Sequence, residues 1–145
     1  MALPTGSGTE TLHAHQFQDV DGDQTLIFGV QHHVYTVLSI IAYCNSVAAT
    51  TDYFALAFKG HDGHAGASAA VTNFAKVVLA AGETYVWNDK FSFNGVEPSG
   101  TNVLSASEQI AIAGQTGSAV QELRWQVSGG GDYDVLVTYI DQDNT

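Results

Sequence analysis

Hydrophobic and polar residues alternate one by one along several short stretches of this chain. In residues 122–128, three large apolar side chains are separated by polar ones: Leu123, Trp125 and Val127. A period of two places alternate side chains on opposite faces, which predicts a β-strand with one buried face. Residues 132–141, DYDVLVTYID, alternate in the same way, but Leu136 and Ile140 make the second face partly apolar. We expect that second strand to be partly covered on both sides.

Further stretches of strand composition follow one another at residues 11–18, 25–30, 33–44, 52–60, 74–80, 83–95 and 107–114. The segments between them are rich in Gly, Asn, Asp and Ser, which tolerate turn conformations. About eight or nine short strands with turns between them predict a sandwich or a barrel. We expect an all-β fold, a single-domain antiparallel β-sandwich that is jelly-roll-like. Asp89 interrupts an aromatic row in residues 83–95, which predicts a bulge or a barrel rim near Asn88 and Asp89.

Two parts of the chain depart from this pattern. Residues 66–82 have the Ala and Lys content of a helix, but β-branched residues such as Val77 and Val78 weaken that interpretation, so a helical turn or two is the alternative there. The first ten residues are rich in Thr and Gly. We expect residues 1–15 to form an extended N-terminal arm and residues 16–145 to form the β-sandwich domain.

Composition narrows the classes of partner. The length of 145 residues suits one domain. Fifteen acidic residues against four basic ones give a formal net charge of −11, which argues against binding to nucleic acid or to an anionic membrane. The N-terminus lacks a basic start followed by an apolar stretch, and no segment approaches the roughly twenty apolar residues of a membrane helix. We therefore expect a protein that is made soluble inside a cell.

Histidines flank an acidic trio near the start of the chain: His13, His15, His32 and His33 around Asp19, Asp21 and Asp23. His13 and His15 are two residues apart, so a strand would place both on one face, as metal ligands require. The residues after His15 do not continue a cupin-like ligand pattern. The trio is not an EF-hand, because Gln24 and Val30 stand where that loop needs Gly and Glu.

Turn chemistry explains the acidic trio better than metal binding does. Asp21 and Gly22 predict a hairpin turn between residues 13–20 and 24–30, although a weak surface calcium site is compatible with that turn. In residues 60–66, GHDGHAG, the spacing of His61 and His64 does not match the helical motif of zinc hydrolases. We predict no metal ligands and no cofactor.

Catalytic patterns are also missing from the sequence. The single Cys44 lies in an apolar run and is expected to be a buried hydrophobic residue rather than a nucleophile. The chain contains no Gly-x-Ser-x-Gly elbow and no phosphate-binding Gly-x-x-x-x-Gly-Lys motif. A pair such as Asp89 and Glu108 can be imagined in a glycosidase, but any acidic chain offers such pairs. We predict no enzyme and no catalytic residue.

A resemblance covers roughly residues 34–141. The successive stretches are VYTVLSIIAYCNSVAATTDYFALAFKG, VVLAAGETYVWNDKFSFNG, VLSASEQIAIAGQTGSAVQELRWQVSG and DYDVLVTYID. Their order resembles that of the small β-sandwich structural proteins of tailed bacteriophages. In both, a strand that ends in Asn is followed by an Ala-Gly-Glu-Thr edge and then by a closing hairpin. The resemblance implies a virion component, and the composition suits a head decoration or cement protein best.

The resemblance also implies partners and a location. Such proteins are typically trimers that clamp subunits of the major capsid protein on the outer surface of the head, after synthesis in the host cytoplasm. In this interpretation the arm from Ala2 to His15 would reach a neighbouring subunit and add backbone hydrogen bonds at a sheet edge. The expected partner-binding residues are Leu3, Thr5, Thr9, Leu12, His13 and His15.

Two other functions are compatible with the sequence. A phage tail, baseplate or fibre protein can share the same sandwich. A carbohydrate-binding module or a small metal-binding β-barrel protein would bind its ligand as an isolated domain. In a sugar-binding module Trp87 or Trp125 would be an exposed stacking platform, whereas the alternation of apolar residues places both in the core.

Overall fold

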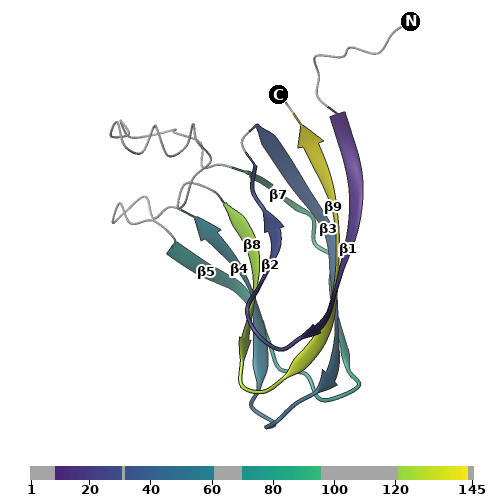
Figure 1. Cartoon of the computed structure of the whole chain (residues 1–145), viewed down its shortest axis with the longest axis vertical. Coiled ribbons are helices and arrows are strands. Elements are labelled where there is room, and N and C mark those ends of the chain that lie inside the picture. Colours follow the sequence, from purple (N-terminus) through teal and green to yellow (C-terminus); the bar gives the residue numbers. More distant parts are fainter. Residues whose placement is uncertain (1–8, 31, 61–69, 96–120, 144–145) are drawn as a thin grey trace, which may run out of the picture.

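The computed structural model describes residues 9–30, 32–60, 70–95 and 121–143 (Figure 1). These residues form nine β-strands: β1 (Thr9–Val20), β2 (Gln24–Phe28), β3 (His33–Ser46), β4 (Tyr53–Gly60), β5 (Ala70–Val77), β6 (Thr84–Trp87), β7 (Phe91–Asn94), β8 (Glu122–Ser128) and β9 (Asp132–Asp143). No helix among the described residues has the length and apolar content needed to cross a bilayer.

The strands form two antiparallel sheets that face each other (Figure 1). The first sheet has the order β1-β9-β3-β6, and β7 pairs with β3 beside β6. The second sheet has the order β2-β8-β4-β5. The prediction of an all-β antiparallel sandwich is confirmed.

The core lies between the two sheets because each strand turns one row of apolar side chains inward. Leu123 and Trp125 of β8 are fully buried, and in β9 the buried residues Val135 and Val137 alternate with partly exposed ones. Trp125 stacks on Phe54 of β4 with ring centroids 4.1 Å apart. The alternation seen in the sequence therefore corresponds to burial between the sheets.

Two local predictions have clear outcomes. The single strand expected at residues 83–95 is two strands, since β6 ends at Trp87 and β7 begins at Phe91; the break falls where the bulge was predicted. In residues 66–82 the described part, Ala70–Val77, is strand β5 and not helix. The strand expected at residues 107–114 lies outside the described residues.

The predicted hairpin at Asp21 and Gly22 is wrong. A bend does follow β1 there, but β1 belongs to the first sheet and β2 to the second. β1 pairs with β9 and β2 pairs with β8, so the short connection crosses from one sheet to the other. Turn residues can determine where the chain bends, but they do not determine which strands pair afterwards.

Candidate functional site

The residues predicted to bind a partner lie near the start of the chain. Four of them are in β1, which pairs with β9 of the same chain: Thr9, Leu12, His13 and His15. Leu3 and Thr5 lie outside the described residues. Residues 9–15, which the sequence analysis assigned to an arm, thus form the outer edge of the first sheet. Leu12 is 66% exposed. Contact of these side chains with a partner stays a prediction.

β1 is the longest edge strand in the described part of the chain. Ten of its 12 residues pair with β9 on one side, and no described strand pairs with the other side. The other edge strands have 5 residues in β2, 8 in β5, and 4 each in β6 and β7. β5 carries Lys76, a residue type that discourages strand addition, whereas the carboxylates Glu10 and Asp19 are the charges of β1. Within the described residues, the other side of β1 is therefore the longest strand edge without a partner strand.

His13 and His15 lie on one face of β1, as their spacing predicts. Both rings pack against Tyr139 of β9, with centroids 5.1 Å and 5.4 Å from the tyrosine ring. The Tyr139 hydroxyl lies 3.5 Å from Nδ1 of His15. The two imidazoles thus take part in aromatic packing. The described residues do not bring them together with a third His, Cys, Asp or Glu in a metal-binding arrangement.

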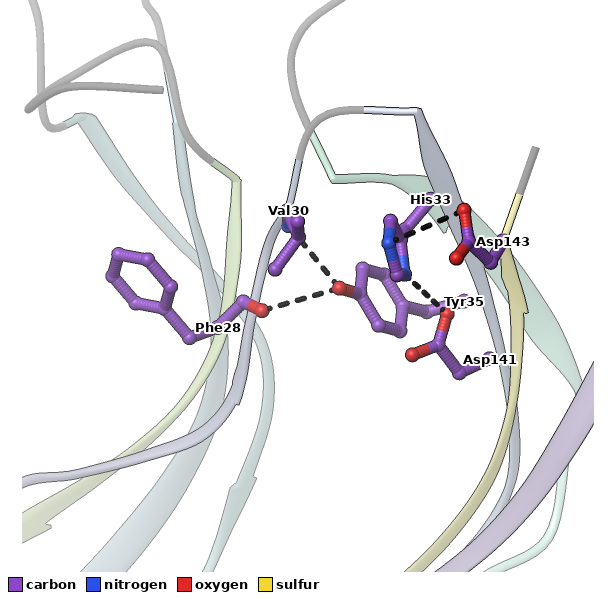
Figure 2. Close-up of polar contacts among 6 residues, drawn as sticks. All are labelled: Phe28, Val30, His33, Tyr35, Asp141 and Asp143. Carbon is purple, nitrogen blue, oxygen red and sulfur yellow. Dashed lines mark hydrogen bonds and ion pairs between the residues drawn. The ribbon is translucent and has the colours of Figure 1, made fainter. Parts of the chain in front are cut away.

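A polar cluster joins β3, β9 and the connection that follows β2 (Figure 2). His33 of β3 lies between two carboxylates of β9: its Nδ1 is 2.7 Å from Oδ1 of Asp141, and its Nε2 is 3.6 Å from Oδ1 of Asp143. The hydroxyl of Tyr35 accepts a hydrogen bond from the Val30 N–H at 3.1 Å and donates one to the Phe28 carbonyl at 3.4 Å. Because Phe28 belongs to the second sheet, Tyr35 ties the two sheets together.

The environment of Tyr35 changes its acidity. Burial, assisted by the negative charge of Asp141, raises the pKa of Tyr35 to about 12 from an ordinary value of 10. The neutral form is thus favoured in the folded state. The stabilisation that this raised pKa gives the folded state is complete below pH 10. It is lost as the pH rises through about 12, where the folded chain also loses the proton. We expect the stability gap between the natural chain and Tyr35→Phe to narrow over this window in urea titrations at successive pH values. A stability gap that widens between pH 10 and 12 would contradict a raised pKa of Tyr35 in the folded state.

Exchange of Tyr35 for phenylalanine tests whether the hydroxyl of Tyr35 holds the two sheets together. The variant leaves the Val30 N–H and the Phe28 carbonyl without the hydroxyl partner, which should cost about 1–3 kcal/mol of unfolding free energy. Tyr133→Phe is the matched control, because the buried Tyr133 hydroxyl has no hydrogen-bond partner among the described residues. We expect the control to lose much less in urea denaturation. Equal losses for the two variants would show that the bridge contributes nothing.

Cys44 fits the prediction of a buried hydrophobic residue. It is fully buried, and its thiol lies 3.5 Å from the Ser46 carbonyl and 3.9 Å from the Leu79 carbonyl. Burial, followed by the negative charge of Glu83, raises the pKa of the Cys44 thiol. Because the thiolate is the reactive form, these surroundings disfavour a nucleophile. Glu108, paired with Asp89 as a hypothetical glycosidase couple, lies outside the described residues.

One group of carboxylates could hold a cation. Asp19 of β1 lies close to Asp132 and Asp134 of β9, with one oxygen from each residue within 4.8 Å of the others. Asn45 donates to Oδ1 of both β9 carboxylates, at 3.1 Å and 3.0 Å. An all-oxygen set of this kind suits a hard cation such as Ca²⁺. In the sequence Asp19 groups with Asp21 and Asp23, and nothing there indicates the β9 pair, because β9 is more than a hundred residues away.

The two tryptophans differ in their surroundings. Trp125 is fully buried in the core, as expected. Trp87 is half-buried, packs against Phe74 and Phe91, and donates a hydrogen bond from Nε1 to the Asp89 carbonyl at 2.8 Å. Both rings are thus engaged by the fold, so neither is placed as an open stacking platform.

No protein-family model and no curated protein sequence matches this chain. Among solved structures, a protein of the Bacillus endospore appendages, described as a family of disulfide-linked pili, has 7% sequence identity and a TM-score of 0.44, over 100% of this chain and 98% of that chain. A chain of infectious bursal disease virus, Gx strain, has 10% identity and a TM-score of 0.35, over 94% of this chain and 36% of that chain. The Gt strain gives 11% identity and a TM-score of 0.30, over 96% and 35% of the two chains. Likenesses at these TM-scores carry no argument about what this chain does.

Proposed function

We propose that this chain is a non-enzymatic structural protein that decorates the outer surface of a tailed-bacteriophage head and clamps neighbouring subunits of the major capsid protein. The resemblance of residues 34–141 to small phage structural proteins suggests the setting. The observation that carries the proposal is the open edge of β1. In this proposal the chain binds as a trimer, and its contacts stabilise the shell without any chemical step.

The open edge supplies a means of attachment. In an edge strand about half of the backbone N–H and C=O groups point away from the sheet, and an added strand can satisfy them. β1 offers 12 residues for this purpose, with Leu12 and Ala14 exposed beside the edge. Strand addition needs no particular side-chain chemistry, so a capsid loop or arm of extended conformation would suffice as the partner.

The net charge of the chain and the mass-action effect of binding also support a decoration role. The net charge of −11 favours a basic surface on the partner and long-range attraction to it. A protein that binds only neighbouring subunits of an assembled shell adds its binding free energy to that state and to no other. Decoration would therefore resist disassembly of the shell without catalysis.

Copy number in particles tests the proposed role. We expect quantitative mass spectrometry of purified virions of the encoding phage to give a ratio to the major capsid protein near one-to-one, or a simple fraction of it. A handful of copies per particle would instead assign the chain to a tail or fibre. Its absence from the particle would overturn the proposal.

Added charge on the edge strand tests the proposed contact. The double variant Leu12→Lys, Ala14→Lys places two lysines on exposed positions of β1 and should weaken co-sedimentation with undecorated heads at least tenfold, about 1.4 kcal/mol. Val71→Lys is the control, because it adds a lysine at an exposed position of the edge strand β5. We expect the control to bind normally, and melting curves should show that both variants are folded. Normal binding of the double variant would exclude β1 as the contact.

A further inference from the structure

A shallow hollow of about 200 Å³ lies in the outer face of the first sheet. The inner face of this sheet carries the buried residues Val135 and Val137, so the residues that alternate with them in β9 face away from the core. Six of the lining residues come from three neighbouring strands: Gln16 and Gln18 of β1, Ile41 and Tyr43 of β3, and Asp134 and Leu136 of β9. The hollow lies on the face of the sheet and shares β1 with the open edge, whereas no residue of the polar cluster around His33 lines it.

An irregularity in β1 accompanies the hollow. β1 and β9 pair in register from Thr9 to Phe17, and the register then shifts before Val20. Asp19, inside the shift, has a φ of 53°, which a residue with a side chain seldom adopts. Bulges of this kind redirect side chains and often occur beside binding sites. Here the shift places Gln18 beside the hollow rather than in a regular row.

The lining of the hollow is mostly apolar and includes a few polar side chains. Gln16, Leu136 and Ile41 are neighbours in one row across β1, β9 and β3. In the next row Tyr43 pairs with Asp134, and Tyr43 is 43% exposed. The side-chain amides of the glutamines can both donate and accept hydrogen bonds. The lining thus combines the exposed Tyr43 ring, two amides and a carboxylate with four apolar residues, Phe17, Ile41, Val135 and Leu136.

The carboxylate of Asp134 is held in place. Its Oδ1 accepts hydrogen bonds from the backbone N–H of Asp19 and from Nδ2 of Asn45, each at 3.0 Å. The other oxygen accepts no hydrogen bond from the described residues, so it can accept one from a ligand hydroxyl. A fixed acceptor loses little conformational entropy when a ligand binds.

These features match the chemistry of a sugar ring. The negative face of an aromatic ring attracts the C–H bonds on one face of a pyranose, and the ring hydroxyls pair with carboxylates and amides. The volume lies below the roughly 300–1,000 Å³ of sites for drug-sized ligands, which suits a single ring. The net charge of −11, together with Asp19 and Asp132 close to Asp134, disfavours an anionic sugar.

We propose that the hollow between β1, β3 and β9 binds one ring of a neutral saccharide, with Tyr43 as the stacking platform and Asp134, Gln16 and Gln18 as hydrogen-bonding groups. This inference goes beyond head decoration, because it gives the chain a ligand of its own. The ligand would use the face of the sheet and leave the open edge of β1 free.

Nuclear magnetic resonance titration tests the site. The probes are neutral trisaccharides built from glucose, galactose, mannose or N-acetylglucosamine, with trigalacturonate as an anionic counterpart. We expect at least one neutral probe to shift the backbone amide signals around Gln18, Tyr43 and Asp134, with a dissociation constant in the millimolar range. No shift with any neutral probe would overturn the proposal, and so would tighter binding of trigalacturonate.

Variants assign the binding to this hollow. Tyr43→Ala should weaken binding at least tenfold, and Gln18→Ala, which changes an exposed side chain, should weaken it several-fold. Val86→Ala is the control, because Val86 is 53% exposed on β6 and does not line the hollow. Unchanged binding by both Tyr43→Ala and Gln18→Ala would overturn the site. Leu12→Lys, Ala14→Lys should bind the sugar normally, so failure of the sugar site and failure of the head-decoration proposal are distinguishable.

Discussion

Replacement of Trp125 by alanine is expected to lower the free energy of unfolding by about 3–5 kcal/mol. Trp125 is fully buried on β8 and stacks on Phe54 of β4, with an interplanar angle of 13°. It also meets the ring of Tyr133 of β9 edge-on, at a centroid distance of 5.4 Å. Because Tyr133 belongs to the first sheet, the indole ring connects the two layers. Alanine would remove that contact and leave a cavity between them.

Urea denaturation followed by circular dichroism measures this loss. Trp87→Ala is the matched control, since it deletes the same side chain from a half-buried position on β6. We expect a clearly smaller loss for the control. If Trp125→Ala does not fold, Trp125→Phe keeps an aromatic ring and should still be less stable than the natural chain. Similar losses for the alanine variants at Trp125 and Trp87 would contradict the central role of Trp125.

Much of the fold could be predicted from the sequence because the signal was local. The alternation in β8 and β9 corresponds directly to buried and partly exposed rows. The predicted limits of β5 were less accurate, since a strand was expected at residues 74–80 and the observed strand is Ala70–Val77. Leu79 then leaves the strand and is buried in the core, whereas Val78 is 53% exposed. An apolar run of this kind does not reveal where pairing stops.

Long-range pairing could not be predicted in the same way. Asp21 and Gly22 indicated a turn correctly, but the sheet that β2 joins depends on its pairing with β8. The hollow proposed to bind a sugar depends on non-local contacts as well, because Tyr43 meets Asp134 only through the register of β3 and β9. Neither residue stands out in the sequence, where Tyr43 looks like one more apolar position. Among the residues of the candidate sites, the common face of His13 and His15 did follow from their spacing.

Asp52→Ala is expected to destabilise the end of the sandwich that holds the turn before β4. The carboxylate is buried, and its Oδ2 accepts hydrogen bonds from the N–H groups of Ala48 at 2.8 Å, Ala49 at 2.9 Å and Gly130 at 3.3 Å. Gly130 lies between β8 and β9, so Asp52 joins two turns that are distant in sequence. Alanine would leave three N–H groups without this acceptor, and the unfolding equilibrium constant should rise about tenfold or more.

The pH dependence of Asp52→Asn separates the charge of Asp52 from its shape. The pKa of Asp52 lies below its ordinary value of 3.8, chiefly because the carboxylate accepts a hydrogen bond from the Ala49 N–H. A carboxylate with a lowered pKa stabilises the fold above its unfolded pKa, and this contribution is lost as the pH falls through the folded value. The stability gap between the natural chain and Asp52→Asn should thus be full at neutral pH and shrink below about pH 4. Asp21→Asn, at an exposed position, is the control and should show no comparable gap. A gap for Asp52→Asn that stays constant into acid would mean that the charge of Asp52 does not hold the two turns together.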